Sequence, residues 1–269
     1  MRTEFRKIIS YAKYIGICLK YNIKSSFSNK KSFIIQTLTM FLNNFMFILF
    51  WMILFKQNNG NINGVNMNDI LYLWSLPVIS FGIALFLFGG VESLVYTIIN
   101  GDLDLYLTLP KHSLISALTS HSRLSAMGDI IFGLLLGVFA VNFNIFQYIF
   151  LIIIAIIAGI TTLCIFCIVR LLCFWLGDIS KVSDTYSLSL FLTFTIYPES
   201  IFGGFGKFLM YTIVPAIYTT HFPIRIVKFL DIKLLAIVLF ITLILLVFTF
   251  CLYNKGLKRY ESGSSNIAR

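Results

Sequence analysis

Long apolar stretches separated by short polar segments dominate the chain. Five of them cover residues 32–55, 70–99, 124–142, 145–172 and 233–253, and a sixth ends near residue 197. A helix needs about 20 apolar residues to cross a bilayer. The pattern therefore predicts an all-α polytopic membrane protein with six transmembrane helices in a domain covering residues 32–254.

The composition agrees with this pattern. Of the 269 residues, 58% are hydrophobic and only 12% are charged, whereas about a quarter of the residues are charged in a typical soluble domain. Six spans of this length leave no room for a soluble catalytic domain. A water-soluble enzyme is excluded.

Residues 203–231 fit neither a span nor a hydrophilic loop. Their apolar run is only about 14 residues long and is broken by Pro215 and Pro223, which is typical of a re-entrant or interfacial segment. We expect two short helices that enter the membrane from one side. The alternative is a seventh span distorted by proline, which would put the two termini on opposite sides.

Residues 1–31 predict a helix that lies on the membrane surface. Basic side chains recur with helical spacing and form one stripe, while Tyr11, Ile15 and Leu19 point away from it. A helix with one basic and one apolar face lies in the interface. The alternative is a cytoplasmic helix packed on another domain. The stripe consists of Arg6, Lys13, Lys20, Lys24 and Lys31.

Basic residues are distributed unevenly between the two predicted sides. With six spans and a cytoplasmic N-terminus, sixteen Lys and Arg fall inside and five outside, as the positive-inside rule requires. Both termini, including the tail at 255–269, are expected in the cytoplasm. The net charge of +10 is explained by contact with anionic lipid, so we expect no nucleic-acid partner.

No motif predicts a catalytic, cofactor or metal site in this chain. The glycines at 203, 204 and 206 precede Lys207, but a phosphate-binding loop needs Ser or Thr next, and residue 208 is Phe. The pair Cys164 and Cys167 has metal-ligand spacing but no second pair, so packing is favoured. The three histidines are scattered along the sequence.

The connection at 100–112, with the sequence NGDLDLYLTLPKH, predicts a short cytoplasmic helix. Gly101 breaks the second span, Asp102 is a candidate cap, and Pro110 ends the helix. Leu103, Tyr106 and Leu107 give it an apolar face, and Asp104 lies between them. A capped helix with an exposed apolar face is suited to docking into the groove of another protein.

Five short motifs occur in a consistent order: Glu92-Ser93, NGDLDLYLTLP, YPESIFGG at 197–204, IVPAIYTTHFP at 213–223 and KGLKRYESGS at 255–264. Together they resemble the type-two membrane-domain family of ABC exporters. The closest likeness is to bacterial permeases of the daunorubicin and peptide-export kind, and it covers nearly the whole chain.

The resemblance implies a permease in the bacterial cell membrane that works with a second, identical or related permease. It also implies a pair of cytoplasmic ATP-binding subunits that hold ATP and magnesium and contact residues 101–110, the coupling helix. The cargo, which can be drug-like, peptide or lipid-like, does not follow from it. The alternatives are an ion-coupled secondary transporter and an intramembrane enzyme acting on lipid or peptide.

Four ionisable residues lie within or at the ends of the predicted spans: Glu92, Asp129, Arg170 and Glu199. Charges there cost several kcal/mol unless they are paired or hydrated, so each marks either an ion pair or a contact with cargo. By depth, Glu92 and Arg170 both lie near the cytoplasmic side and can pair. Glu199 lies near the outer face.

Overall fold

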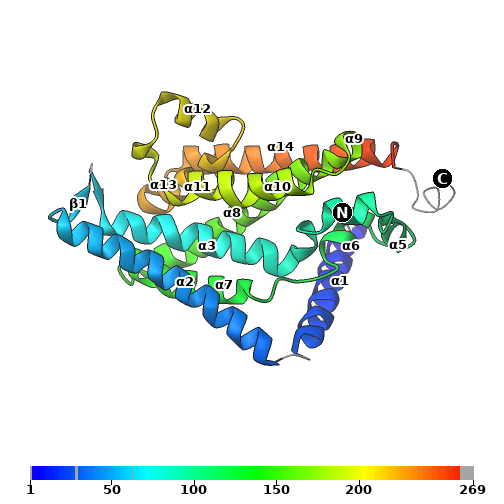
Figure 1. Ribbon diagram of the computed structural model, residues 1–269, viewed down its shortest axis with the longest axis horizontal. Coiled ribbons are helices and arrows are strands. Elements are labelled where there is room, and N and C mark those ends of the chain that lie inside the picture. The colour runs from blue at the N-terminus through cyan, green and yellow to red at the C-terminus, as the bar shows by residue number, and fades with distance from the viewer. Residues whose placement is uncertain (1, 28–29, 63, 261–269) are drawn as a thin grey trace.

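The computed structural model describes residues 2–27, 30–62 and 64–260, and these residues form helices and one two-stranded ribbon. Figure 1 shows the long helices other than the first lying roughly along the longest axis of the molecule. The ribbon β1 (Asn61–Ile62) and β2 (Val65–Asn66) lies at one end, the ribbon end. The short helices α5 (Leu103–Leu107) and α6 (Ser113–Leu118) lie at the other, the α5 end.

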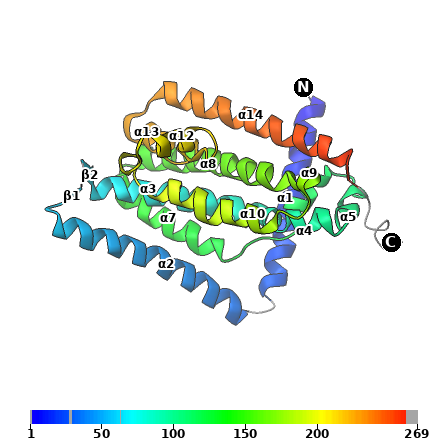
Figure 2. The same ribbon diagram turned by 45° about the horizontal axis from the view of Figure 1, so that its top comes forward.

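The first helix, α1 (Arg2–Ser26), runs across the bundle instead of along it, as Figures 1 and 2 both show. Its inward face meets the connection that carries α6. Asn22 Nδ2 donates to Thr119 O and Ser122 Oγ, both at 3.1 Å, and Tyr11 OH accepts from His112 N at 3.3 Å. Lys13, Lys20 and Lys24 are exposed on the opposite face, so this part of the basic stripe faces away from the protein. Lys31, predicted on the same helix, lies in the next one, which begins at Lys30.

Four helices build the centre of the bundle: α2 (Lys30–Gln57), α3 (Met67–Phe88), α7 (Ala126–Ala140) and α8 (Ile145–Leu171). Helix α3 lies in the middle, and its side chains from residue 72 to residue 80 are buried. Ser80 Oγ bonds to Ala155 O at 3.0 Å, and a Cβ at Gly159 would lie 3.0 Å from Ser80 O. Small residues let α3 and α8 approach closely, as is common between membrane helices.

The predicted second span is interrupted at its α5 end. After α3 comes a 3₁₀ turn, η2 (Gly89–Val91), and then α4 (Leu94–Ile99). A Cβ at Gly89 would lie 2.7 Å from Arg123 N, and one at Gly90 would overlap the backbone of Ala117 and Leu118. Only glycine permits this contact of η2 with the end of α6 and with the connection from α6 to α7.

The predicted fifth span is one rod of three segments, and its middle segment is a π-helix. It contains α10 (Ser180–Thr185), the π-helical η3 (Tyr186–Phe191) and α11 (Leu192–Ile196). The short α9 (Cys173–Leu176) precedes it. Figure 2 shows the rod lying over α3, with α2 and α14 (Ile232–Leu257) at opposite sides of the bundle.

Among the described residues, four helices are long and apolar enough to cross a membrane: Lys30–Gln57, Met67–Ile99, Ile145–Leu176 and Ile232–Leu257. Helix α7 has 15 residues and falls short of that length, and the rod from α10 to α11 is also short. The all-α membrane fold is confirmed, and six spans remain an expectation.

The segment predicted at 203–231 contains α12 (Gly204–Tyr211), a 3₁₀ turn η5 (Ala216–Tyr218) and α13 (His221–Phe229), after the turn η4 (Glu199–Ile201). Figure 1 shows all of it at the ribbon end, between the end of α11 and the start of α14. Pro215 directly precedes η5, and Pro223 lies in the first turn of α13. Neither short helix crosses the bundle. The predicted tail at 255–269 lies outside the described residues from residue 261 onward.

Candidate functional site

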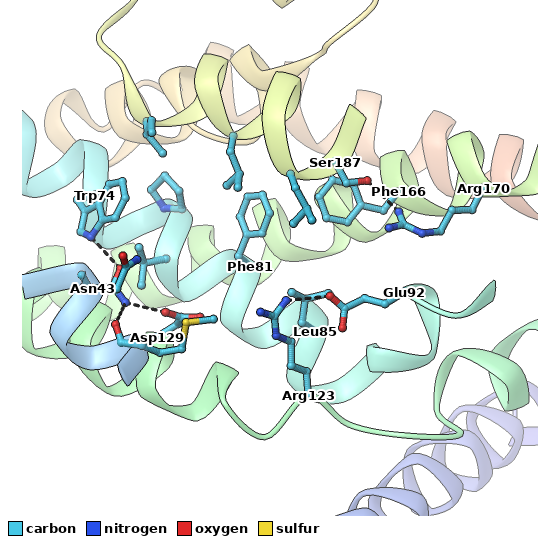
Figure 3. A pocket seen from close by; sticks show the side chains of 17 residues that line it. Asn43, Trp74, Phe81, Leu85, Glu92, Arg123, Asp129, Phe166, Arg170 and Ser187 are labelled. Atoms are coloured by element: carbon cyan, nitrogen blue, oxygen red, sulfur yellow. Dashed lines mark hydrogen bonds and ion pairs between the residues drawn. The ribbon is translucent and has the colours of Figure 1, made fainter. Parts of the chain in front are cut away.

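A pocket of about 200 Å³ lies in the bundle, between α2, α3, α7, α8 and the rod from α10 to α11. Most of its wall is apolar, and Phe81 and Phe166 face it. Four ionisable side chains also line it, as Figure 3 shows. These are Glu92, Arg123, Asp129 and Arg170. A cavity with an apolar wall and a few polar groups is the usual form of a binding site for a small molecule.

Asn44 links three helices at one side of this pocket. Its Nδ2 donates to Asp129 Oδ1 at 2.6 Å, and its Oδ1 accepts from Trp74 Nε1 at 3.0 Å. The residue is 3% exposed. A single amide side chain on α2 therefore joins α3 through Trp74 and α7 through Asp129, and it satisfies one oxygen of a carboxylate within the bundle.

The α5 end of the pocket carries an ion pair between Glu92 and Arg123. Arg123 Nη1 donates to Glu92 Oε1 at 2.8 Å, and Arg123 Nε donates to Ser125 Oγ at 3.2 Å. Both members of the pair are partly exposed. The pair bridges the turn after η2 and the connection before α7, at the pocket's edge.

Arg170 is 3% exposed and makes a separate set of contacts. Its Nη2 donates to Asp184 Oδ1 at 3.1 Å and its Nη1 to Ser187 Oγ at 2.9 Å, both on the α10–η3 rod. Its guanidinium carbon lies 5.6 Å from the centre of the Phe166 ring. The Nε hydrogen has no acceptor among the described residues.

The predicted pairing of Glu92 with Arg170 is wrong. Both residues line the central pocket, but Glu92 pairs with Arg123 and Arg170 pairs with Asp184. Depth follows from position along a helix, whereas the partner also depends on the direction in which each helix faces. The direction in which the connection carrying Arg123 faces cannot be inferred from the sequence.

Glu199 lies at the ribbon end, away from the other three candidates. Its Oε2 accepts from Arg225 Nη2 at 2.9 Å. A second pair, between Lys228 and Asp69, joins α13 to the start of α3. Both pairs line another pocket of about 270 Å³, beside the buried His221. Glu199 is therefore part of a charged cluster that fastens α13.

Sequence reasoning missed three residues that shape the central pocket: Asn44, Trp74 and Ser187. A signal for Asn44 was present, since an amide in the middle of an apolar span must find a partner. The signal for Ser187 is weaker, because a serine can bond to its own helix. The π-helix that carries it, η3, is a feature often found at functional sites, and its sequence does not reveal it.

The short helix predicted within residues 101–110 is observed as α5, but its exposed face differs from the prediction. Leu103 is fully buried and Tyr106 is half-buried, whereas Leu105 is 68% exposed and Leu107 and Leu109 are also exposed. The expectation that Leu103 lies on the outer face is therefore wrong. Gly101 has φ of +83°, which turns the chain so that the first residue of α5 faces the bundle.

The ends of α5 also differ in detail from the prediction. Asp102 precedes the helix, but its side chain makes no capping hydrogen bond. The helix ends at Leu107, and Thr108 Oγ1 donates to Leu105 O at 2.9 Å. Pro110 follows on the surface. With α5 held from within by Leu103, the apolar side chains of residues 105–109 remain on the surface of the chain.

The model of the ABC-2 family of transporter proteins matches residues 41–264. The chain belongs to this family. No curated protein and no solved structure matches it. The matched range runs from within α2 to beyond α14, so it includes the whole of α5 and every residue that lines the central pocket except Met40. The protein is therefore a multi-pass membrane permease of an ABC transporter, and the predicted family is confirmed at this level.

Proposed function

We propose that this ABC-2 permease is the membrane half of an ATP-driven exporter in the cell membrane of a bacterium. Its cargo is a drug-like, peptide or lipid-like molecule, as in the daunorubicin and peptide-export subgroup that the motifs resemble. The observation that carries the proposal is the central pocket, where Glu92, Arg123, Asp129 and Arg170 meet an aromatic and aliphatic wall inside the bundle. Such a wall suits an amphipathic cargo.

The direction of the chain supports six spans with both termini in the cytoplasm. Helices α2, α7 and the rod run toward the ribbon end, and α3, α8 and α14 run back (Figure 1). The start of α2 and the end of α14 therefore share the α5 end, where the basic residues of α1 also lie. Under the positive-inside rule this end faces the cytoplasm.

Energy enters through a partner in this proposal. Two cytoplasmic subunits bind ATP and magnesium, and each contacts the exposed residues 105–109 of one permease. A second permease, identical or related, completes the pathway. When the ATP-binding subunits close together, the force on α5 moves the helices as rigid bodies and opens the pocket to the other side.

Reconstitution of the purified permease tests the proposal. Alone in liposomes it should hydrolyse no ATP, and with its ATP-binding subunit it should show cargo-stimulated hydrolysis and transport. Replacing the phosphate-loop lysine of the partner should abolish both activities, whereas Lys207→Ala in the permease should preserve them. Transport driven by an ion gradient without a partner, or conversion of a lipid or peptide by the permease alone, would reject the proposal.

A further inference from the structure

A second apolar cavity, of about 230 Å³, lies beneath α1 at the α5 end. Ile15 of α1 covers it, Leu114 and Leu118 of α6 form one side, and α8 and α14 form the floor. The central pocket and this cavity share helices α3 and α8 but no lining residue, so the cavity is separate from the proposed cargo pathway.

Two hydrogen bonds between side chains bracket this cavity along α14. Toward the middle of the bundle, Thr161 Oγ1 and Thr242 Oγ1 lie 2.7 Å apart. Toward the α5 end, Ser113 Oγ and Tyr253 OH lie 2.6 Å apart. The helices are held at both positions, so the space between them is fixed by the fold and is lined by Cys164, Cys167, Leu246, Thr249 and Phe250.

Water is a poor occupant of this space. Thr249 contributes the only hydroxyl group of the wall among the described residues, and its Oγ1 already donates to Leu245 O at 2.7 Å. A buried water needs two to four polar partners, and apolar cavities of about 150 Å³ stay dry and bind apolar molecules. The cavity is larger than that, so a hydrocarbon fits it better.

The cavity opens toward lipid. Ile160 on its rim is 39% exposed, and the next exposed side chains on α8, Ile156 and Ile153, continue away from it. Leu243 and Val247 of α14 are exposed on the facing helix. A lipid chain can therefore enter from the bilayer without crossing a polar barrier.

A cationic group lies at the cytoplasmic rim. Lys111 Nζ donates to Ser10 Oγ and lies 4.7 Å from the centre of the Tyr11 ring. Lys111 lies three residues before Leu114, just outside the start of α6, and Tyr11 is one helical turn before Ile15, so this contact lies next to two residues of the wall. An ammonium group has three donors, which leaves Lys111 able to bind a phosphate.

We propose that the cavity under α1 binds one acyl chain of an anionic phospholipid from the cytoplasmic leaflet, whose phosphate contacts Lys111. The bound chain fills the space between α1, α6, α8 and α14. The lipid then acts as a structural ligand that fastens the interface helix to the bundle, at a site separate from the central pocket.

Photolabelling in nanodiscs tests this proposal with the full permease. The probe is phosphatidylglycerol with a diazirine near the end of one chain, diluted in phosphatidylcholine. We expect adducts within residues 114–118, 160–167 and 246–250. Unlabelled phosphatidylglycerol should compete about fivefold better than phosphatidylcholine, the ratio that corresponds to ~1 kcal/mol for one lysine near an anionic surface.

Two variants and a matched control distinguish binding of the acyl chain from recognition of the lipid headgroup. Leu163→Trp fills the cavity and should remove most of these adducts, whereas Ile156→Trp, on the exposed face of the same helix, should keep them. Lys111→Gln should keep the adducts and lose the preference for phosphatidylglycerol. Adducts spread over the exposed residues of α8 and α14 without competition, in the unchanged permease, would overturn the proposal even if Leu163→Trp fails to fold.

Discussion

Asn44 shows how one polar side chain can organise a membrane bundle. Its amide donates to the Asp129 carboxylate and accepts from the Trp74 indole, so three helices depend on a residue that is itself buried. Each of these groups would be costly in lipid without a partner. The sequence places Asp129 within a predicted span, but its partner could not be predicted, because the direction in which each helix faces depends on packing.

Asn44→Ala should destabilise the permease by about 1–3 kcal/mol, since the half-buried carboxylate of Asp129 loses a hydrogen-bond donor. The measurement is denaturant unfolding in detergent. Asn43→Ala is the matched control, because Asn43 is exposed and no hydrogen bond to Asp129 is formed by it. In the background of Asp129→Asn, the cost of Asn44→Ala should be smaller. An equal loss of stability in the two backgrounds would show that the hydrogen bond between Asn44 and Asp129 does not contribute to stability.

We predict that the stability of the protein depends on pH through His112, which lies at the contact between α14 and the start of α6. Its ring lies 5.0 Å from the ring of Phe250, and burial lowers the pKa of His112 from its ordinary value. A histidine with a lowered pKa in the folded state favours the neutral form. Stability is therefore unaffected well above pH 6.5 and falls as the pH drops through the ordinary pKa toward the lowered one.

The comparison is between the unchanged protein and His112→Gln. The difference in melting temperature between them should shift in favour of the variant as the pH falls from 8 to 5. His121→Gln, at an exposed histidine in the next connection, serves as the control. The difference in melting temperature between His121→Gln and the unchanged protein should be the same at pH 8 and at pH 5. A gap between protein and variant that is constant over this range would contradict the prediction.

At the level of helices, the positions of most could be predicted from the sequence, but their interruptions could not. The apolar run at 145–172 corresponds to α8 (Ile145–Leu171). The helix begins there because Asn144 Oδ1 caps its first turn by accepting from Phe146 N and Gln147 N. The predicted second span breaks at Gly89 because another segment presses against it. A contact between distant segments leaves no periodic signal in the sequence.

Helix α5 is too short for its inward face to be read from the sequence. Five residues give little more than one turn, so a small rotation decides which leucines are exposed. The φ of Gly101 sets that rotation and buries Leu103. Whether α5 docks an ATP-binding subunit stays a prediction. It is tested at the exposed Leu105 and Leu107, because Leu103 is buried.

Leu105→Asp with Leu107→Asp should leave the permease folded but weaken co-purification with the ATP-binding subunit and abolish coupled transport. Charges at two exposed positions would have to enter an apolar groove, at a cost of roughly 1–3 kcal/mol each. Leu103→Asp is the contrast: it places a charge at a fully buried site and should lower the melting temperature. Normal binding and transport by the double variant would place the docking site elsewhere.

In the molecule as a whole, the two ends differ in charge. One end is cationic, and at the other the charged side chains form ion pairs. The α5 end carries α1 with its exposed lysines, and the ribbon end carries the pairs Glu199–Arg225 and Asp69–Lys228. The count of basic residues predicted this polarity. The pairs at the ribbon end could not be predicted, since α13 and α3 are far apart in sequence.

Accessibility of single cysteines tests the orientation. In a background without the five native cysteines, Asn58→Cys beside the ribbon should react with an impermeant maleimide on intact cells. Thr108→Cys, beside α5, should react only after the membrane is opened. Both positions are exposed in the structure, so low reactivity of Thr108→Cys is not caused by burial. Labelling of both cysteines from the same side would reject six spans.

The contact at Gly89 and Gly90 makes the end of α3 and the connection after α6 a single stiff joint. Arg123 N donates to Leu85 O at 3.1 Å across this joint, and the side chain of the same Arg123 holds Glu92 at the pocket's edge. Backbone packed on backbone does not compress. In the proposed transport cycle, a displacement of α5 and α6 would therefore reach the charged residues of the pocket with almost no loss, and it would change the electric field that a bound cargo experiences.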